Sequence, residues 1–358
     1  MQRFGLVGLP NSGKSSLFNA LTGGNSPVAG YAFATTGTHL GEAKVADERL
    51  QRISRMSASA TTTPAAVQFT DIGGLAAGAA AGEGLGNRFL GGIRELDALV
   101  LVLRAFRSEE VEGICDPVES LYTLELELSL ADLESLERQI DKKRRQAKGD
   151  ATIGPDVARM ERAAAVLAAG TPLWRSDLPD DERRLLAPCV LLTNKPIVAV
   201  VNTGEEAVAA DVEDTLGAVA SELGGAETLA VCAQLEAEVA ELPEAERAEM
   251  AESLQLGEGA LARVVAASYR RLGLQTFFTT APKETRAWPF PAGSTADVCA
   301  GLIHTDFQRG FIRAETIQWD ELLEIGSWSA ARAAGRLRAE GRSYVVQDGD
   351  VLEIRFNV

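Results

Sequence analysis

The chain has 358 residues, of which 46% are hydrophobic and 24% are charged, and its formal net charge is −16. This composition is ordinary for a folded protein, excludes extended disorder, and at this length allows two or three domains. The negative charge disfavours general binding to nucleic acid, which depends on clustered Lys and Arg. No apolar stretch approaches the roughly 18 residues of a membrane helix, so we expect a cytoplasmic protein with no membrane partner.

The first part of the chain alternates strands and helices. An apolar strand at 4–8 leads through a glycine-rich turn into a helix at 15–21. Further strands are expected at 66–71 and 98–103, with a helix at 87–95 between them. This alternation predicts a mostly parallel sheet with helices on both faces, and ligands at the carboxyl ends of its strands.

The hydrophobic period changes from Pro117 onward. Apolar residues recur there at steps of three and four, which predicts one apolar stripe on a long helix. A second striped segment at 157–167 follows a turn that contains Gly149 and Pro155. We expect an inserted antiparallel helical hairpin whose first helix projects roughly 40 Å. The residues of the first stripe are Leu126, Leu130, Leu133, Leu136 and Ile140.

A small α+β module is expected after Gly273. Strands at 276–280 and 311–317 enclose a short helix at 296–303. Near the end of the chain, Asp348-Gly349 lies between alternating apolar residues, which is a strong signal for a β-hairpin. The pattern is typical of a ubiquitin-like β-grasp domain.

The residues from Gly8 to Ser15 read GLPNSGKS and fit the phosphate-binding pattern G-x-x-x-x-G-K-[ST]. The glycines let backbone N–H groups cradle phosphates at the amino end of the following helix. Lys14 is the expected catalytic cation at the β- and γ-phosphates, and the Ser15 hydroxyl is an expected Mg²⁺ ligand. The predicted phosphate-contacting residues are Asn11, Ser12, Gly13, Lys14, Ser15 and Ser16.

A second phosphate motif, Asp71-Ile-Gly-Gly74, stands at the end of an apolar strand. Asp71 could hold Mg²⁺ through water, and the Gly74 N–H could sense the γ-phosphate. Between the two motifs, Thr35 and Thr36 are candidates for a further Mg²⁺ ligand, the alternative being an ordinary polar loop.

Leu75 follows the second motif, at the position where Ras-like GTPases carry the glutamine that orients water. Leucine cannot orient water, so hydrolysis should be slow or should depend on a cation or a partner. Asn11 could help to hold K⁺ beside the phosphates, or it could be a turn residue.

Two Asn-led tetrapeptides could read the nucleotide base. Asn194-Lys-Pro-Ile imitates the guanine motif N-K-x-D but precedes the strand at 197–201. Asn202-Thr-Gly-Glu205 follows that strand and therefore lies on the ligand edge, and Cys232 after the next strand could add a backbone contact. The guanine motif's Asp accepts bonds from N1–H and N2–H₂, donors that adenine lacks, so guanine selectivity should be lost. In the alternative interpretation Asn202 and Glu205 only cap a helix.

The motifs above and several further segments resemble the YchF-type, Obg-like ATPases over nearly the whole chain. The resemblance implies a G domain interrupted by a coiled-coil arm, a carboxyl-terminal TGS domain, ATP binding with slow hydrolysis, and association with ribosomes. It favours Thr35 as the Mg²⁺ ligand and implies a hydrophobic residue at Leu75. Thr203 replaces the usual Met or Leu of the base motif, Cys232 replaces a Ser, and the family's loop histidine is missing. The carrying segments are 8–22, 71–90, 202–205, 233–242, 272–279, 304–315 and 348–358.

The domains and function follow from these motifs. We predict an α/β P-loop fold of the G-domain type. The predicted function is that of an ATPase switch that associates with the ribosome, and the alternatives are an Obg-like GTPase and a nonhydrolysing adaptor. Ribosomal RNA could contact the basic run at 142–145 or a TGS surface near His304, although both have purely structural interpretations. The oligomeric state is left open. The predicted domains are the nucleotide-binding domain at 1–116 and 191–273, the arm at 117–190 and the β-grasp domain at 274–358.

Overall fold

The computed structural model describes residues 2–23, 39–72, 85–107, 113–243, 246, 250 and 259–357. Its first sheet has six strands, and the pairings of β1 with β4 and β5, of β5 with β6 and of β6 with β7 are all parallel. The predicted α/β fold of the G-domain type is thereby confirmed. In spatial order the strands are β2 (His39–Lys44), β4 (Ala66–Asp71), β1 (Arg3–Val7), β5 (Ala98–Ala105), β6 (Ile197–Thr203) and β7 (Thr228–Val231).

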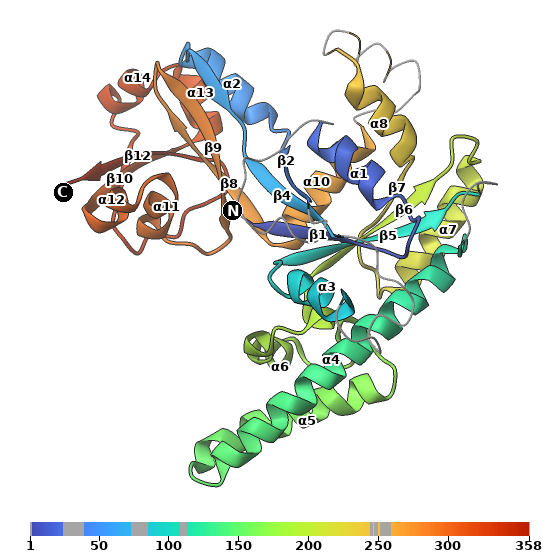
Figure 1. Ribbon diagram of the computed structural model, residues 1–358. Helices are drawn as coiled ribbons and strands as arrows, with labels where there is room; N and C mark the ends of the chain where they lie inside the picture. Colours follow the sequence, from blue (N-terminus) through green and yellow to red (C-terminus); the bar gives the residue numbers. More distant parts are fainter. Residues whose placement is uncertain are drawn as a thin grey trace. The chain divides into compact units, whose positions relative to one another are not determined.

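Helices connect these strands and cover the sheet (Figure 1). The strands β5 and β6 are buried along almost their whole length, as expected for parallel strands that are covered on both faces. Among the described residues, no helix has the length and apolar character needed to cross a membrane. The helices of this part are α1 (Lys14–Thr22), α3 (Leu85–Arg94), α7 (Ala209–Glu222), α8 (Ala233–Glu241) and α10 (Ala260–Arg271).

The arm consists of two long helices, α4 (Pro117–Ala147) and α5 (Gly154–Ala168), that run side by side (Figure 1). Its 31-residue first helix is capped by Asp116, whose carboxylate accepts hydrogen bonds from two backbone N–H groups of the first turn. At ~1.5 Å per residue α4 is about 46 Å long. The arm also holds α6 (Asp180–Leu185) and the 3-10 turns Ala151–Ile153, Leu173–Arg175 and Ala187–Cys189, and the 3-10 turn Leu192–Asn194 leads from the arm into β6.

The predicted apolar stripe on α4 is only partly correct. Leu136 and Ile140 are buried against α5, as expected. Leu126 and Leu130 are exposed, because the first half of α4 packs onto the nucleotide domain through a different face. That face consists of Leu121, Leu124, Leu128 and Ala131.

The second sheet also has six strands. It contains an antiparallel pair of β8 (Leu274–Thr280) and β9 (Glu284–Pro291), and β10 (Phe311–Gln318) is antiparallel to β12 (Asp350–Phe356). The prediction of a hairpin across Asp348-Gly349 was wrong. Gly349 does form a turn with φ of 86°, but β12 pairs with β10 and, in parallel, with β8. The remaining elements are β11 (Arg338–Glu340), β3 (Thr61–Thr63), α11 (Ala296–Ile303), α12 (Thr305–Arg309), α13 (Trp319–Ile325) and α14 (Trp328–Ala333).

Residues 44–67 belong to the same compact unit as the carboxyl-terminal residues 269–358. The sequence had placed this segment in the nucleotide-binding domain, and the difference has a clear physical cause. Its strand β3 pairs in parallel with β9 and thereby covers one edge of the second sheet. Its helix α2 (Glu48–Met56) carries Arg49, which forms ion pairs with both Asp47 and Asp348.

Candidate functional site

The loop between β1 and α1 has the backbone of a phosphate-binding loop. Asn11 and Gly13 have φ angles of 62° and 87°, in the left-handed region that favours glycine. A Cβ atom on Gly13 would overlap the side-chain amide of Asn202, and one on Gly8 would lie 2.5 Å from the Val102 carbonyl oxygen. Close packing therefore requires glycine at both positions, and at Gly13 the left-handed backbone favours it as well.

Lys14 begins α1 and lies almost completely buried. Its Nζ donates a 2.8 Å hydrogen bond to the backbone carbonyl of Leu9, within the same loop. Burial lowers the pKa of Lys14, and the nearby Asp71 carboxylate opposes that change. A cation held at the amino end of a helix, among loop N–H groups, can receive the phosphates of a nucleotide.

Ser15, in the first turn of α1, and Asp71, at the end of β4, come together and form a pair of oxygen ligands. The Ser15 hydroxyl donates a 2.7 Å hydrogen bond to Oδ2 of Asp71. The other carboxylate oxygen, Oδ1, is buried and has no hydrogen-bond partner among the described residues. A buried carboxylate oxygen beside a serine hydroxyl matches the hard oxygen donors that Mg²⁺ prefers. These residues therefore fit a magnesium ion at the edge of the first sheet where Lys14, Ser15 and Asp71 lie, which we call the phosphate edge.

Asn202 links three segments of the site. Its side-chain amide donates a 2.9 Å hydrogen bond to the carbonyl of Ser12, and its oxygen accepts a 3.0 Å bond from the Ala233 N–H. The residue stands at the carboxyl end of β6 and is buried. It thus joins the phosphate loop to the start of α8, on the sheet edge that the sequence predicted.

The other residues of the base motif are more exposed to solvent than Asn202. Thr203 is half-buried and Glu205 is exposed. Cys232 precedes α8, and burial raises the pKa of its thiol, with a further contribution from the charge of Glu205. Because Ala233, the residue after Cys232, donates to Asn202, the start of α8 lies beside the base motif.

Sequence reasoning missed Arg104 and Phe106. Arg104 pairs in register with Asn202 on the neighbouring strand and is 2% exposed. Its Nε donates a 3.0 Å hydrogen bond to the Phe106 carbonyl, and its guanidinium carbon lies 4.6 Å from the centre of the Phe106 ring. A Cβ on Gly204 would lie 3.4 Å from Phe106, so this side chain flanks the base motif. The available signal was an arginine at the carboxyl end of an otherwise apolar strand.

Several predicted residues lie outside the described part of the chain or away from this edge. Thr35, Thr36, Gly74 and Leu75 fall in the ranges 24–38 and 73–84, outside the described residues. His304 caps α12, where its Nδ1 accepts a 3.1 Å hydrogen bond from the backbone N–H of Asp306. His304 therefore acts as a hydrogen-bonded anchor of this loop, which is the structural interpretation of this residue.

Comparisons with known proteins cover nearly the whole chain. Residues 3–127 match a family described as a 50S ribosome-binding GTPase, and residues 274–357 match the YchF-type GTPase carboxyl-terminal family, described as a protein of unknown function. A protein of Bacillus subtilis named ribosome-binding ATPase YchF is 41% identical over 99% of both chains. The chain belongs to the YchF family.

Other YchF proteins support the same assignment. A relative of Escherichia coli O157:H7 with the same name is 40% identical over 99% of both chains. The solved structure of the Schizosaccharomyces pombe YchF GTPase has a TM-score of 0.83 and 29% identity, and it covers 99% of this chain and 97% of its own. The fold of the YchF family therefore extends through both units of this chain.

Proposed function

We propose that this protein is a nucleotide-dependent switch that binds and slowly hydrolyses ATP with Mg²⁺ and associates with the ribosome. The observation that carries the proposal is the Ser15–Asp71 pair beside the buried Lys14, with a base motif that lacks the guanine-reading Asp. The relatives at 40–41% identity are named ribosome-binding ATPases. Such a partner suits a cytoplasmic location.

Each residue of the phosphate edge has a defined part in this proposal. Lys14 exchanges its bond to the Leu9 carbonyl for the β- and γ-phosphate oxygens, and its buried charge stabilises the negative charge there. Ser15 and Asp71 hold Mg²⁺, directly or through water, and their mutual hydrogen bond keeps both oxygens in position. When bound, Mg²⁺ neutralises charge on the phosphate oxygens.

Slow hydrolysis is expected from the residue types around the γ-phosphate. Leu75 cannot orient a water molecule, and Asn11 is placed in the phosphate loop where its side chain could help to hold K⁺. Gly74 and Thr35 complete the proposed γ-phosphate and Mg²⁺ contacts. We expect a low basal rate that K⁺ or a bound partner increases.

Selectivity for adenine is proposed from the base motif and its neighbours. Glu205 is longer than the Asp of the guanine motif, and Thr203 removes the Lys that stacks on guanine. Phe106 provides apolar surface beside Gly204 of this motif, and the half-buried Cys232 precedes α8. A GTPase is the second candidate, because the solved structure from S. pombe is titled a GTPase.

Contact with ribosomal RNA is proposed for the tip of the arm. Two cations of the predicted basic run are used within the arm, since Lys143 pairs with Asp156 at 2.8 Å and Arg144 pairs with Glu161 at 2.6 Å. Lys142 and Arg145 are exposed. They are therefore the side chains most available to phosphate groups, and the TGS domain is the second proposed contact.

Turnover of ATP by the purified protein tests the enzymatic proposal against a nonhydrolysing adaptor. We expect phosphate release that requires Mg²⁺ and that falls at least about a hundredfold in Lys14→Ala, a loss typical for a principal charge contact. Lys195→Ala is the matched control, because the half-buried Lys195, like Lys14, donates to backbone carbonyls, but it lies at the amino end of β6, away from the phosphate loop. Turnover that persists in Lys14→Ala would contradict the proposal.

A further inference from the structure

A line of three large apolar side chains lies exposed on α4. Tyr122, Leu126 and Leu130 follow one another at intervals of four residues and have exposed fractions of 46%, 51% and 46%. Side chains four apart share one helix face, so they form a continuous stripe about 12 Å long, which we call the α4 stripe. The other residues from Ser120 to Asp132 are buried, except the half-buried Thr123. The solvent face of this helix segment is therefore apolar.

A hollow of about 370 Å³ opens beside the stripe, lined by Tyr122, Leu126 and the segment 170–172. Arg175 and Glu125 complete the lining, and they are joined by an ion pair at 2.8 Å. The hollow is large enough for an apolar side chain and places a buried carboxylate next to it.

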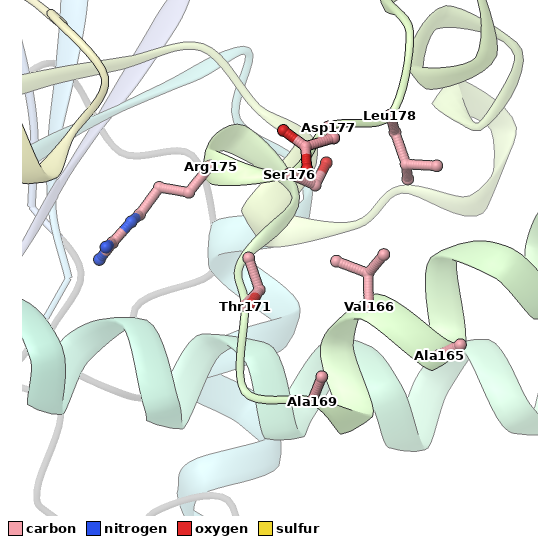
Figure 2. Close-up of a pocket in the computed structure, with 8 residues that line it drawn as sticks. All are labelled: Ala165, Val166, Ala169, Thr171, Arg175, Ser176, Asp177 and Leu178. Atoms are coloured by element: carbon pink, nitrogen blue, oxygen red, sulfur yellow. The ribbon is translucent and has the colours of Figure 1, made fainter.

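Arg175 also borders a second hollow, of about 450 Å³, against α5. Figure 2 shows its side chain extending away from the other residues that line this second hollow, among them Val166 and Leu178. The guanidinium is held by Glu125 and, at 2.9 Å, by Glu222 of α7. The positive charge beside the stripe is thus matched by two carboxylates.

Exposed acidic residues lie beyond both ends of the α4 stripe. Between Pro117 and Glu137 the sequence has six acidic residues and no Lys or Arg, and of these Glu119, Glu134 and Glu137 are exposed. Glu119 lies three residues before Tyr122 and Glu134 four residues after Leu130, so each end of the stripe carries a carboxylate, although Glu134 also pairs with the exposed Arg138 at 3.2 Å. Such surroundings repel nucleic-acid phosphates, anionic lipids and a second copy of the same acidic surface, and they attract basic groups.

We propose that the α4 stripe is a docking site for a basic amphipathic helix of a protein partner. The apolar face of that helix would lie along the stripe, with one large side chain in the hollow between Tyr122 and Leu126. Its Lys or Arg side chains would lie near Glu119 and Glu134. The proposal does not rest on the nucleotide chemistry, because no residue of the stripe belongs to the phosphate edge.

A synthetic peptide tests the proposal on the full-length protein. The probe is a fluorescein-labelled helical peptide of about 18 residues, made of Leu and Lys with all leucines on one face, and binding is measured by fluorescence anisotropy. We expect a micromolar Kd. A peptide of the same composition without a helical apolar face, and one with Glu in place of Lys, should each bind at least about tenfold more weakly.

Variants of the protein then locate the site. Leu126→Ser/Leu130→Ser should weaken binding of the peptide at least about tenfold. Leu185→Ser/Val208→Ser is the matched control, because these side chains are 56% and 60% exposed elsewhere. It should change binding less than about twofold. A second variant, Glu119→Gln/Glu134→Gln, keeps the stripe and should reduce the salt dependence of binding.

Three results would overturn the proposal: no binding of the Leu–Lys peptide, equal binding of the Glu peptide, or equal loss of binding in the control variant. Circular dichroism checks that each variant is folded. ATP binding by the stripe variants should equal that of the wild-type protein. Failure of the wild-type protein to bind ATP would contradict the proposed function and leave the docking result intact.

Discussion

The side-chain amide of Asn202 donates a hydrogen bond of 2.9 Å to the backbone carbonyl of Ser12. The same side chain accepts a bond from the Ala233 N–H, so a single buried amide satisfies groups of two loops. A buried polar group that loses its partner destabilises a protein by roughly 1–3 kcal/mol. The residue that the sequence assigned to base recognition therefore also maintains the shape of the phosphate loop.

Replacing Asn202 should impair both stability and nucleotide binding. Asn202→Ala leaves the Ser12 carbonyl and the Ala233 N–H without partners, so we expect the free energy of unfolding to fall by about 1–3 kcal/mol and nucleotide affinity to fall at least about tenfold. Denaturant titration and isothermal titration calorimetry measure the two effects.

Asn194→Ala provides the control for that experiment. The Asn194 side chain donates to the Arg183 carbonyl at 2.9 Å and accepts from Arg183 Nε at 3.2 Å, at the opposite end of β6. Its loss should lower stability without changing nucleotide affinity. Equal affinities for Asn202→Ala and the wild-type protein would show that the amide does not organise the loop.

Two glycines in left-handed conformation should respond differently to alanine. Gly13→Ala would place a Cβ atom on the Asn202 amide, whereas Gly23 has φ of 72° and no atom of the described residues within 4 Å of such a Cβ. We expect Gly13→Ala to abolish measurable ATP binding, and Gly23→Ala to retain it with a stability loss of about 1 kcal/mol. Retention of ATP binding by Gly13→Ala, measured by calorimetry, would contradict the close packing of this loop.

The site at the phosphate edge was largely predictable from sequence because its chemistry is local. The spacing of Gly8, Lys14 and Ser15 identifies a strand, a loop and a helix, and the position of Asp71 at a strand end brings it to the same edge. The structure adds what spacing cannot encode, namely that Arg104 lies beside Asn202 on the neighbouring strand.

The errors in the fold arose from nonlocal packing. Leu126 fits the same period as Leu136, yet the two face different surroundings, because α4 passes from the nucleotide domain to the arm. The turn at Gly349 was correct, but the partners of β12 are strands far away in sequence. Likewise, β3 pairs with β9, which lies more than two hundred residues later in the sequence, and a local sequence pattern cannot predict such a pairing.

Arg49 should stabilise the carboxyl-terminal unit. Its guanidinium pairs with Asp47 at 2.8 Å and with Asp348 at 2.7 Å, and hydrogen bonds to these carboxylates raise its pKa against the effect of burial. Arg49→Met should lower the free energy of unfolding of this unit by about 1–2 kcal/mol. Arg55→Met, at an exposed position of the same helix, should change it by less than about 0.5 kcal/mol. Urea denaturation, with limited proteolysis as the readout, measures the stability of this unit in both variants. Equal losses of stability in Arg49→Met and Arg55→Met would contradict the role assigned to Arg49.

Glu315 should make the carboxyl-terminal unit sensitive to acid. It accepts hydrogen bonds from Arg332, Arg355 and Arg313, and these lower its pKa from an ordinary 4.5 to about 2, with Arg332 the largest cause. A carboxylate whose folded pKa is depressed contributes stability above its unfolded pKa and loses it as the pH falls through the folded value. That contribution should therefore decline between about pH 4.5 and pH 2.

Glu315→Gln measures this contribution. At pH 7 we expect the variant to be less stable than the wild-type protein by on the order of 1–2 kcal/mol, because solvent screens the attraction between Glu315 and its partly exposed arginine partners. The difference should narrow as the pH falls below about 4.5. Urea denaturation followed by tryptophan fluorescence at pH 7, 4.5 and 3 gives the values, and a difference that does not depend on pH would contradict the assignment.

The central claim, that this YchF protein selects ATP through the Asn202–Glu205 motif, is tested most directly by titrating one preparation with ATP and with GTP. The wild-type protein should bind ATP at least about tenfold more tightly than GTP. Glu205→Asp, which restores the carboxylate length of the guanine motif, should reduce that ratio. Equal or tighter binding of GTP by the wild-type protein would contradict the claim and favour a GTPase.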